Sequence, residues 1–251
     1  MTATMGAAAL FLVACGTPPG QFVIIQDQVP DTSCAIPASL GSLYRDSGDL
    51  DVGLVLDQAN VGYLFFPLMQ NNLPPSNGGA DANRIALSSF EVDLGVPDLD
   101  PANNGDPTYV KIWNLFQTLQ ASNEGLTKYS IPTSGSVASG GGDTAGFVNA
   151  VPADLARMIR DTQALKAPGN YFYLTATVRA QGKTLTSTVT SDPFNFPIRV
   201  CDGCLTNDIG MCPVMNAGGA TGNPCNIAQD QPVDCCELGA QLVCPPLVSG
   251  Q

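Results

Sequence analysis

The sequence predicts an all-β protein: an antiparallel β-sandwich with one short helix and a disulfide-rich, irregular C-terminal tail. Three observations support this prediction. Short apolar and β-branched runs recur along residues 22–200 without alternating helical segments, which favours antiparallel strands over a doubly wound sheet. The 26 Gly and 20 Pro residues interrupt these runs without a fixed period, as turns do. Seven of the nine cysteines follow residue 200.

Four runs in the first part of the chain are expected to be strands. They are Phe22–Ile25, Val52–Leu56, Tyr63–Met69 and Arg84–Leu94. Pro67 has no amide hydrogen to donate to a neighbouring strand, so we expect it at a bulge or near a strand end. In the last of these runs the inward-facing parity changes at Ser88-Ser89, which predicts a β-bulge there.

Two segments carry apolar residues at the spacing of a helix. Tyr109–Leu119 carries apolar residues at helical spacing, but its part Val110–Trp113 is rich in β-forming side chains, and we predict a strand. The one helix that we expect covers about Pro152–Ala164, where apolar residues recur at helical spacing directly after a proline.

The clearest strand signals lie between Tyr171 and Val200. Apolar and polar side chains alternate along Tyr171–Val178, as in a strand with one buried face. We expect Ala180–Lys183 to turn the chain and Thr184–Thr190 to return as a polar strand. Alternation resumes along Phe194–Val200, which we predict to be the last strand of the sandwich.

The approach to this region carries a resemblance. Leu165-Lys-Ala-Pro-Gly-Asn-Tyr171 resembles the corner that leads into a late strand of immunoglobulin-like and fibronectin-type domains. The resemblance implies an immunoglobulin-like sandwich. In those domains the tyrosine hydroxyl bonds back to the preceding loop, so it implies the same for Tyr171.

The N-terminal residues are typical of an export signal. Residues 6–14 form an apolar run too short to span a bilayer, and it ends in Leu12-Val13-Ala14-Cys15, which looks like the lipobox cut by lipoprotein signal peptidase. This implies lipidation at Cys15. Because Met1–Met5 carries no Lys or Arg, we expect the translation start upstream. Gly16, in place of a retention Asp, favours the outer membrane, facing the periplasm or the cell surface.

We expect the chain to consist of four parts. Residues 1–14 are the signal peptide, 15–21 a lipidated tether, 22–200 the β-sandwich domain and 201–251 the cysteine-rich tail. The only membrane contact that we expect is the N-terminal lipid.

Eight cysteines remain once Cys15 takes lipid, and an exported protein meets oxidising conditions, so we expect all eight to form disulfides. They are Cys34, Cys201, Cys204, Cys212, Cys225, Cys235, Cys236 and Cys244. Seven tail cysteines cannot all pair with one another, so Cys34 should bond to one of them, and Cys201 or Cys204 is the preferred mate. The neighbours Cys235 and Cys236 should not bond to each other, because the small ring would be strained.

Cys201-Asp-Gly-Cys204 also fits a redox pair or half of a zinc site. A redox pair usually belongs to a βαβ fold, and zinc requires reduced thiols. Neither fits an exported β-protein, and we therefore expect structural disulfides here.

The end of the chain carries a second resemblance. Phe194–Val200 leads into Cys201-Asp-Gly-Cys204-Leu205, and Gly222-Asn-Pro-Cys225 and the Cys235-Cys236 doublet follow. With the N-terminal signal, this order resembles a group of uncharacterised bacterial predicted lipoproteins. The resemblance implies no activity and no functional residues.

Charge and composition exclude several functions. The formal net charge is −12, which repels nucleic acid and anionic lipid headgroups. The chain has no histidine, so the usual general base and the Ser-His-Asp and Cys-His arrangements are missing. Carboxylate-only chemistry, as in glycoside hydrolysis, remains open.

One acidic loop offers oxygen ligands for calcium. Asp98, Asp100 and Asp106 are the candidate ligands, together with Asn103 and Asn104. Ala102 stands where an EF-hand loop needs a ligand, so ordinary turn residues are the favoured interpretation. We expect no metal and no cofactor.

Two functions remain. The favoured one is a non-catalytic, membrane-anchored bacterial lipoprotein with a structural or binding role at the cell envelope, meeting a protein or glycan partner. The alternative is a carboxylate-dependent carbohydrate-active or glycan-binding protein, which a groove with exposed aromatics and facing acids would favour.

Overall fold

The computed structural model describes residues 20–55, 60–76, 80–100, 106–122, 125–167, 169–212, 221–239 and 241–244. Cys15 and the lipobox lie outside these ranges, as do Asn103 and Asn104. Within them, no helix is long and apolar enough to cross a membrane.

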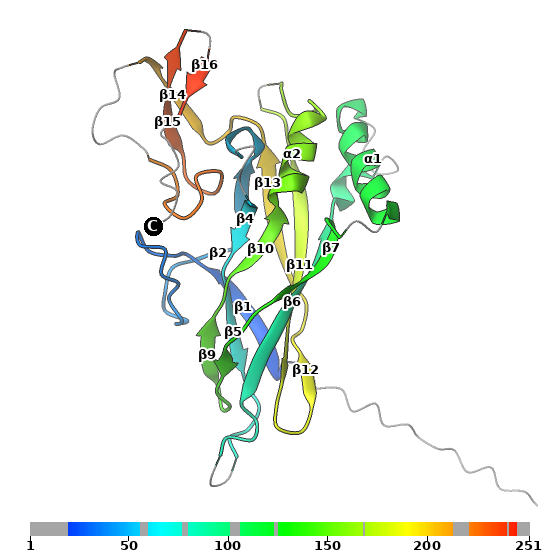
Figure 1. The fold of residues 1–251 in the computed structure, drawn as a ribbon, viewed down its shortest axis with the longest axis vertical. Helices are drawn as coiled ribbons and strands as arrows, with labels where there is room; N and C mark the ends of the chain where they lie inside the picture. The colour runs from blue at the N-terminus through cyan, green and yellow to red at the C-terminus, as the bar shows by residue number, and fades with distance from the viewer. Residues whose placement is uncertain are drawn as a thin grey trace, which may run out of the picture.

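A seven-stranded sheet forms one layer of the protein (Figure 1). Its main path runs through β3 (Gly48–Asp51), β13 (Phe194–Cys201), β11 (Tyr171–Lys183), β6 (Ile85–Gly95) and β7 (Lys128–Pro132). Two short strands extend it: β12 (Thr188–Thr190) pairs with β11, and β8 (Ser136–Val137) pairs with β6. The sheet is antiparallel except where β13 pairs with β3 in parallel, which departs from the expected purely antiparallel sandwich.

Two smaller sheets face it. One has the order β2 (Tyr44–Arg45), β1 (Phe22–Gln28), β5 (Pro67–Asn71) and β9 (Gly142–Ala145), and the other pairs β10 (Val148–Pro152) with β4 (Val61–Phe65). The expected strand Tyr63–Met69 is therefore split between two sheets. Pro67 begins β5, at the strand end predicted for it.

The apolar core lies between these layers. Side chains of β11 alternate between buried and more exposed positions, as its sequence predicts. On the opposite layer, the rings of Tyr63 and Phe65 lie 5.9 and 5.0 Å from the ring of Phe196 on β13. All three side chains are fully buried, so aromatic contacts join the two layers. A β-rich sandwich is confirmed.

The predicted bulge in β6 is present. Gln181 pairs with Ser89 and Gly182 with Leu87, so Ser88 is the extra residue. The predicted turn at Ala180–Lys183 is wrong, because β11 continues through Lys183. Gly182 tolerates this close pairing: a Cβ there would lie 2.5 Å from the Ile85 side chain. The expected strand Thr184–Thr190 is reduced to β12.

The prediction of one short helix is wrong, because the described residues contain two α-helices. α2 (Ala153–Asp161) follows Pro152 as expected. However, α1 (Pro107–Ser122) occupies the segment predicted as a strand. Ile112, Phe116 and Leu119 are buried on one face of α1, so helical spacing decides its structure and the β-rich run does not.

Another expected strand is a short helical turn. Val52–Leu54 forms the 3-10 turn η1, and the strand of this region, β3, comes just before it. The Asp51 carboxylate caps η1 by accepting the Gly53 amide at 3.0 Å. A second 3-10 turn, η2 (Pro97–Leu99), precedes α1.

The described part of the tail is more regular than expected. It forms a three-stranded sheet of β14 (Thr206–Met211), β15 (Val233–Leu238) and β16 (Gln241–Val243), set beside the sandwich in Figure 1. Ile227, Ala228 and Val233 are buried in the same apolar cluster as the sandwich strands. Part of the tail therefore completes the main core.

The structure joins Cys34 to Cys225, Cys201 to Cys204, Cys212 to Cys236 and Cys235 to Cys244. The expected link from Cys34 to the tail is present, but its preferred mates were wrong, because Cys201 and Cys204 bond to each other. Cys235 and Cys236 bond to different partners and not to each other, as predicted.

Candidate functional site

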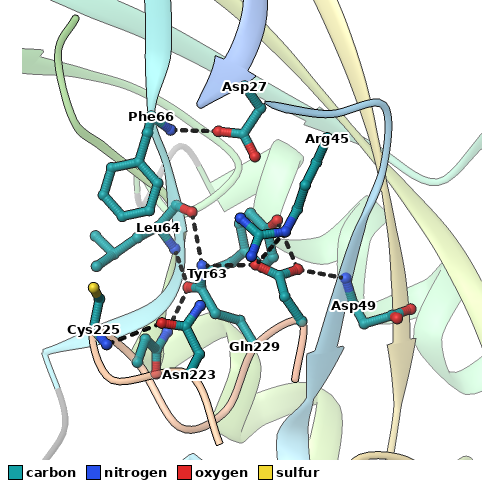
Figure 2. A network of polar contacts seen from close by, with 11 residues as sticks. Asp27, Arg45, Asp49, Tyr63, Leu64, Phe66, Asn223, Cys225 and Gln229 are labelled. Carbon is teal, nitrogen blue, oxygen red and sulfur yellow. Dashed lines mark hydrogen bonds and ion pairs between the residues drawn. The ribbon is translucent and has the colours of Figure 1, made fainter. Parts of the chain in front are cut away.

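Two polar clusters lie where the tail meets the sandwich. We call the first the anchor cluster; it comprises Asp27, Arg45, Tyr63, Gln229 and Asp230 (Figure 2). We call the second the junction groove; it is a surface hollow of about 510 Å³ lined by Lys166, Gly169, Asn170, Tyr171, Arg199, Cys201, Asp202, Gly203 and Cys204.

Gln229 ties the tail to strand β4. Its side-chain oxygen accepts the Leu64 amide at 2.8 Å, and its side-chain nitrogen donates to the Leu64 carbonyl at 3.1 Å. The side chain thus bonds β4 as a neighbouring strand would, and Figure 2 shows it lying against Leu64. Gln229 is fully buried, so this pair of hydrogen bonds satisfies the polar atoms of its side chain.

Asp230 makes the second tie, to β2, β3 and β4. Its carboxylate accepts the Asp49 amide at 3.1 Å and the Tyr63 hydroxyl at 3.0 Å, and it lies 3.5 Å from Nε of Arg45. The Asp230 backbone has a φ of 65°, a conformation that Asp adopts more readily than most residues. Gly48 leaves room for this contact, because a Cβ there would lie 2.1 Å from the Tyr63 hydroxyl oxygen.

Asp27, on β1, lies beside the ion pair of Asp230 and Arg45. One oxygen of its carboxyl accepts the Phe66 amide at 2.7 Å, and the other is buried with no hydrogen-bond partner. Burial raises the pKa of Asp27 to about 7, against the opposing effect of the Phe66 hydrogen bond. Burial also raises the pKa of Asp230, although the Arg45 guanidinium acts to lower it.

The carboxyl groups of the anchor cluster are shielded from solvent, and the Arg45 side chain is 15% exposed. Asp27 and Gln229 are fully buried, and the Asp230 side chain is 3% exposed. Raised carboxyl pKa values often mark active sites, but catalysis also requires access to a substrate. These contacts therefore make the anchor cluster a structural attachment of the tail.

The junction groove contains the opposite arrangement, an exposed aromatic residue among polar groups. Tyr171 is 47% exposed, its ring packs edge-on against Tyr173, and the Arg199 guanidinium lies 6.0 Å from the ring centroid. Arg199 also bonds Asp49 at 2.7 Å, and Lys166 bonds Asp202 at 2.9 Å. The groove thus offers an aromatic ring with donors and acceptors, in nearly balanced charge.

The expected hydrogen bond from the Tyr171 hydroxyl to the preceding loop is replaced by another. The Asn170 side chain donates to the Ala164 carbonyl at 3.2 Å and closes that loop itself. Tyr171 turns its half-exposed ring to the groove instead.

Asp51 holds the loop that forms one wall of the groove. Its fully buried carboxylate accepts the Gly203 amide at 2.8 Å and the Leu205 amide at 2.9 Å, which holds the loop between Cys201 and Cys204. Gly203 has a φ of 85°, a conformation that glycine adopts without strain.

The metal candidates do not come together. Among the residues that the structure describes, the only cluster of three side chains with metal-ligand geometry is Asp51, Cys201 and Cys204, and both sulfurs are bonded to each other. Asp98, Asp100 and Asp106 are not such a group, and each makes other contacts.

Sequence reasoning missed the anchor cluster. Gln229 and Asp230 stand in a polar stretch of the tail without periodicity, and Arg45 follows a turn-rich segment. No local signal could have paired them, because their partners lie more than 160 residues away. For the groove, the sequence offered one indication, the resemblance of Leu165–Tyr171 to the corner before a late strand.

Comparison with known proteins adds no relative: no family model, no curated protein and no solved structure matches the chain.

Proposed function

We propose that this protein is a lipid-anchored bacterial envelope protein with a non-catalytic binding role, and that the junction groove is its binding site. The lipobox-like Leu12-Val13-Ala14-Cys15 and the resemblance to bacterial predicted lipoproteins support the anchoring, and Gly16 supports placement at the outer membrane. The single observation that carries the binding role is the half-exposed Tyr171 in a hollow of about 510 Å³.

The ligand that the groove fits best is a neutral segment of a glycan. An aromatic ring can stack on the apolar face of a sugar, and the neighbouring side chains can bond its hydroxyls. Asn170, Arg199 and Asp202 supply both donors and acceptors within the groove. The ion pairs of Arg199 and Lys166 offset their charge, so the groove does not specifically select an anion.

Glycan binding is favoured over glycan hydrolysis. Hydrolysis needs two carboxyl groups facing the bound sugar. The three aspartates with raised pKa values, Asp27, Asp51 and Asp230, all have buried side chains. The groove acid Asp202 is held by Lys166. We propose the sandwich itself to be immunoglobulin-like, supported by the antiparallel pairing of β11 with both β13 and β6.

Binding is tested on an array of envelope glycans, including peptidoglycan fragments, with wild-type protein and two matched variants. Tyr171→Thr removes the groove ring but keeps a residue suited to a strand. Tyr44→Thr removes a similarly exposed ring, 53% exposed, on β2. We expect wild type and Tyr44→Thr to bind a common glycan and Tyr171→Thr to lose at least tenfold in affinity. Equal binding by all three, or none by wild type, contradicts the proposal.

Lipid anchoring is tested separately, by mass spectrometry of the membrane fraction. The expected species begins at Cys15 and carries acyl mass on it. An unmodified Cys15 thiol in the wild-type protein would rule out the anchor.

A further inference from the structure

We propose that the Cys201–Cys204 disulfide is a reversible thiol-exchange site, opened by a dithiol reductant, whereas the other three bridges are structural. The site lies in the wall of the junction groove, between the end of β13 and the start of β14. The inference does not depend on which ligand the groove binds.

Access favours this bridge over the two bridges within the tail sheet. Cys204 is exposed and lines the groove, so a thiolate can reach its sulfur. In the Cys212–Cys236 and Cys235–Cys244 bridges, Cys236 is 1% exposed, Cys235 is fully buried, and their mates are half-buried. Exchange requires a free line of attack on one sulfur, and the residues of these two bridges are less exposed than Cys204.

Charge separates Cys204 from Cys34, the other exposed disulfide cysteine. The Cys34 amide donates to the Asp31 carbonyl, so Asp31 and its carboxylate belong to the same turn. Hydrogen bonds from Ser33 and Ala35 lower the pKa of Asp31, which keeps it ionised. A thiolate that approaches Cys34 meets this negative charge, whereas in the groove the cations of Lys166 and Arg199 offset the carboxylates of their ion-pair partners, so the charge there is nearly balanced. The Asp51 carboxyl lies within 4.8 Å of both sulfurs and is bonded to the Gly203 and Leu205 amides.

The surrounding loop does not need the bridge to keep its shape. The Asp51 carboxylate holds the amides of Gly203 and Leu205, and β13 and β14 fix the chain on either side. Cys201 and Cys204 are also separated by only three positions, so opening the bridge frees little chain. Cys34 and Cys225, by contrast, are 191 positions apart.

The exchange balances with a dithiol as reductant. One of its thiolates attacks Sγ of Cys204, the Cys201–Cys204 bond breaks, and its electron pair leaves on Sγ of Cys201. The second thiolate then attacks the mixed disulfide and releases Cys204, while the reductant becomes a disulfide. Two electrons and two protons pass to the protein. The Cys201 sulfur lies 3.5 Å from the Leu50 carbonyl oxygen, which can accept the hydrogen of the new thiol.

The test is a titration of the folded, full-length protein with dithiothreitol, followed by alkylation, peptide mapping and circular dichroism of each fraction. Cys201 and Cys204 should be alkylated first, at least tenfold faster than any other pair, with the circular dichroism unchanged. Earlier or equal opening of Cys34–Cys225 or of a tail-sheet bridge overturns the proposal. So does loss of fold on opening Cys201–Cys204.

A pair of charge variants tests the reason for the selectivity. Lys166→Gln should slow the opening of Cys201–Cys204 severalfold, and Asp31→Asn should speed the opening of Cys34–Cys225 while leaving Cys201–Cys204 unchanged. If neither rate moves, the electrostatic argument fails.

Discussion

The anchor cluster and the junction groove are built from the same kinds of residue but differ in access to solvent. Each contains a tyrosine, an arginine and carboxylates at the border of sandwich and tail. In the anchor cluster Tyr63 is fully buried and donates to Asp230; in the groove Tyr171 is 47% exposed. One arrangement attaches the tail, and the other remains open to a ligand.

This comparison shows that a raised carboxyl pKa does not by itself indicate a site that a ligand can reach. The raised pKa of Asp27 follows from burial, and burial also keeps any substrate away. We propose the groove residues as a binding site on other grounds: the exposure of Tyr171, its ring contact with Tyr173 and the hollow that they border.

The largest expected effect comes from the disulfide beside the anchor cluster. Replacing Cys34 and Cys225 together with serine should lower the free energy of unfolding by roughly 5 kcal/mol, because the bridge closes a loop of 191 positions. Urea unfolding measures this. The matched pair Cys201→Ser with Cys204→Ser, three positions apart, should cost roughly 2 kcal/mol. Equal losses would refute the assignment of the first bridge as the main covalent attachment.

The second effect is a pH dependence from Asp27. The folded protein keeps this carboxyl protonated up to its pKa of about 7, whereas the unfolded chain releases the proton near 3.8. Between these values the folded state binds more protons, so stability should decrease as pH rises from about 4 to 7, by up to roughly 4 kcal/mol. Asp27→Asn retains an acceptor for the Phe66 amide and should remove this part of the slope. Equal free energies of unfolding at pH 4.5, 6 and 8 would contradict this prediction.

A smaller effect isolates one hydrogen bond of the anchor cluster. Tyr63→Phe removes the hydroxyl that donates to Asp230 and keeps the ring that packs on Phe196. Its loss should lower stability by about 1–2 kcal/mol. Thermal unfolding measures it, with Tyr129→Phe as a control for loss of a buried hydroxyl that bonds the Asn149 and Ala150 carbonyls elsewhere. A neutral Tyr63→Phe would mean that the hydroxyl does not support Asp230.

Local patterns predict the strands best where one face is buried and the other is not. The alternation along β11 and β13 and the change of parity at Ser88 could be predicted because each depends on neighbours in the sequence. In α1 the same local information allowed two structures, and burial of Ile112, Phe116 and Leu119 against the core decides between them.

Long-range partners could not be predicted from local patterns. Parity required a bond between Cys34 and the tail, but the choice of Cys225 depends on how residues 221–233 pass beside β4. The parallel pairing of β3 with β13 could not be predicted either, because it joins two segments that lie far apart in the sequence. Gln229 and Asp230 carry no pattern of their own, because their partners come from three different strands.

The most direct test of the difference between the two clusters is the urea unfolding of two single variants. Asp230→Asn leaves Arg45, whose side chain is only 15% exposed, without its carboxylate, and it should lower the free energy of unfolding by about 3 kcal/mol. Tyr171→Thr changes an exposed groove residue and should change it by less than about 1 kcal/mol. A neutral Asp230→Asn, or an equally large loss in Tyr171→Thr, would contradict the account of a structural anchor beside a free groove.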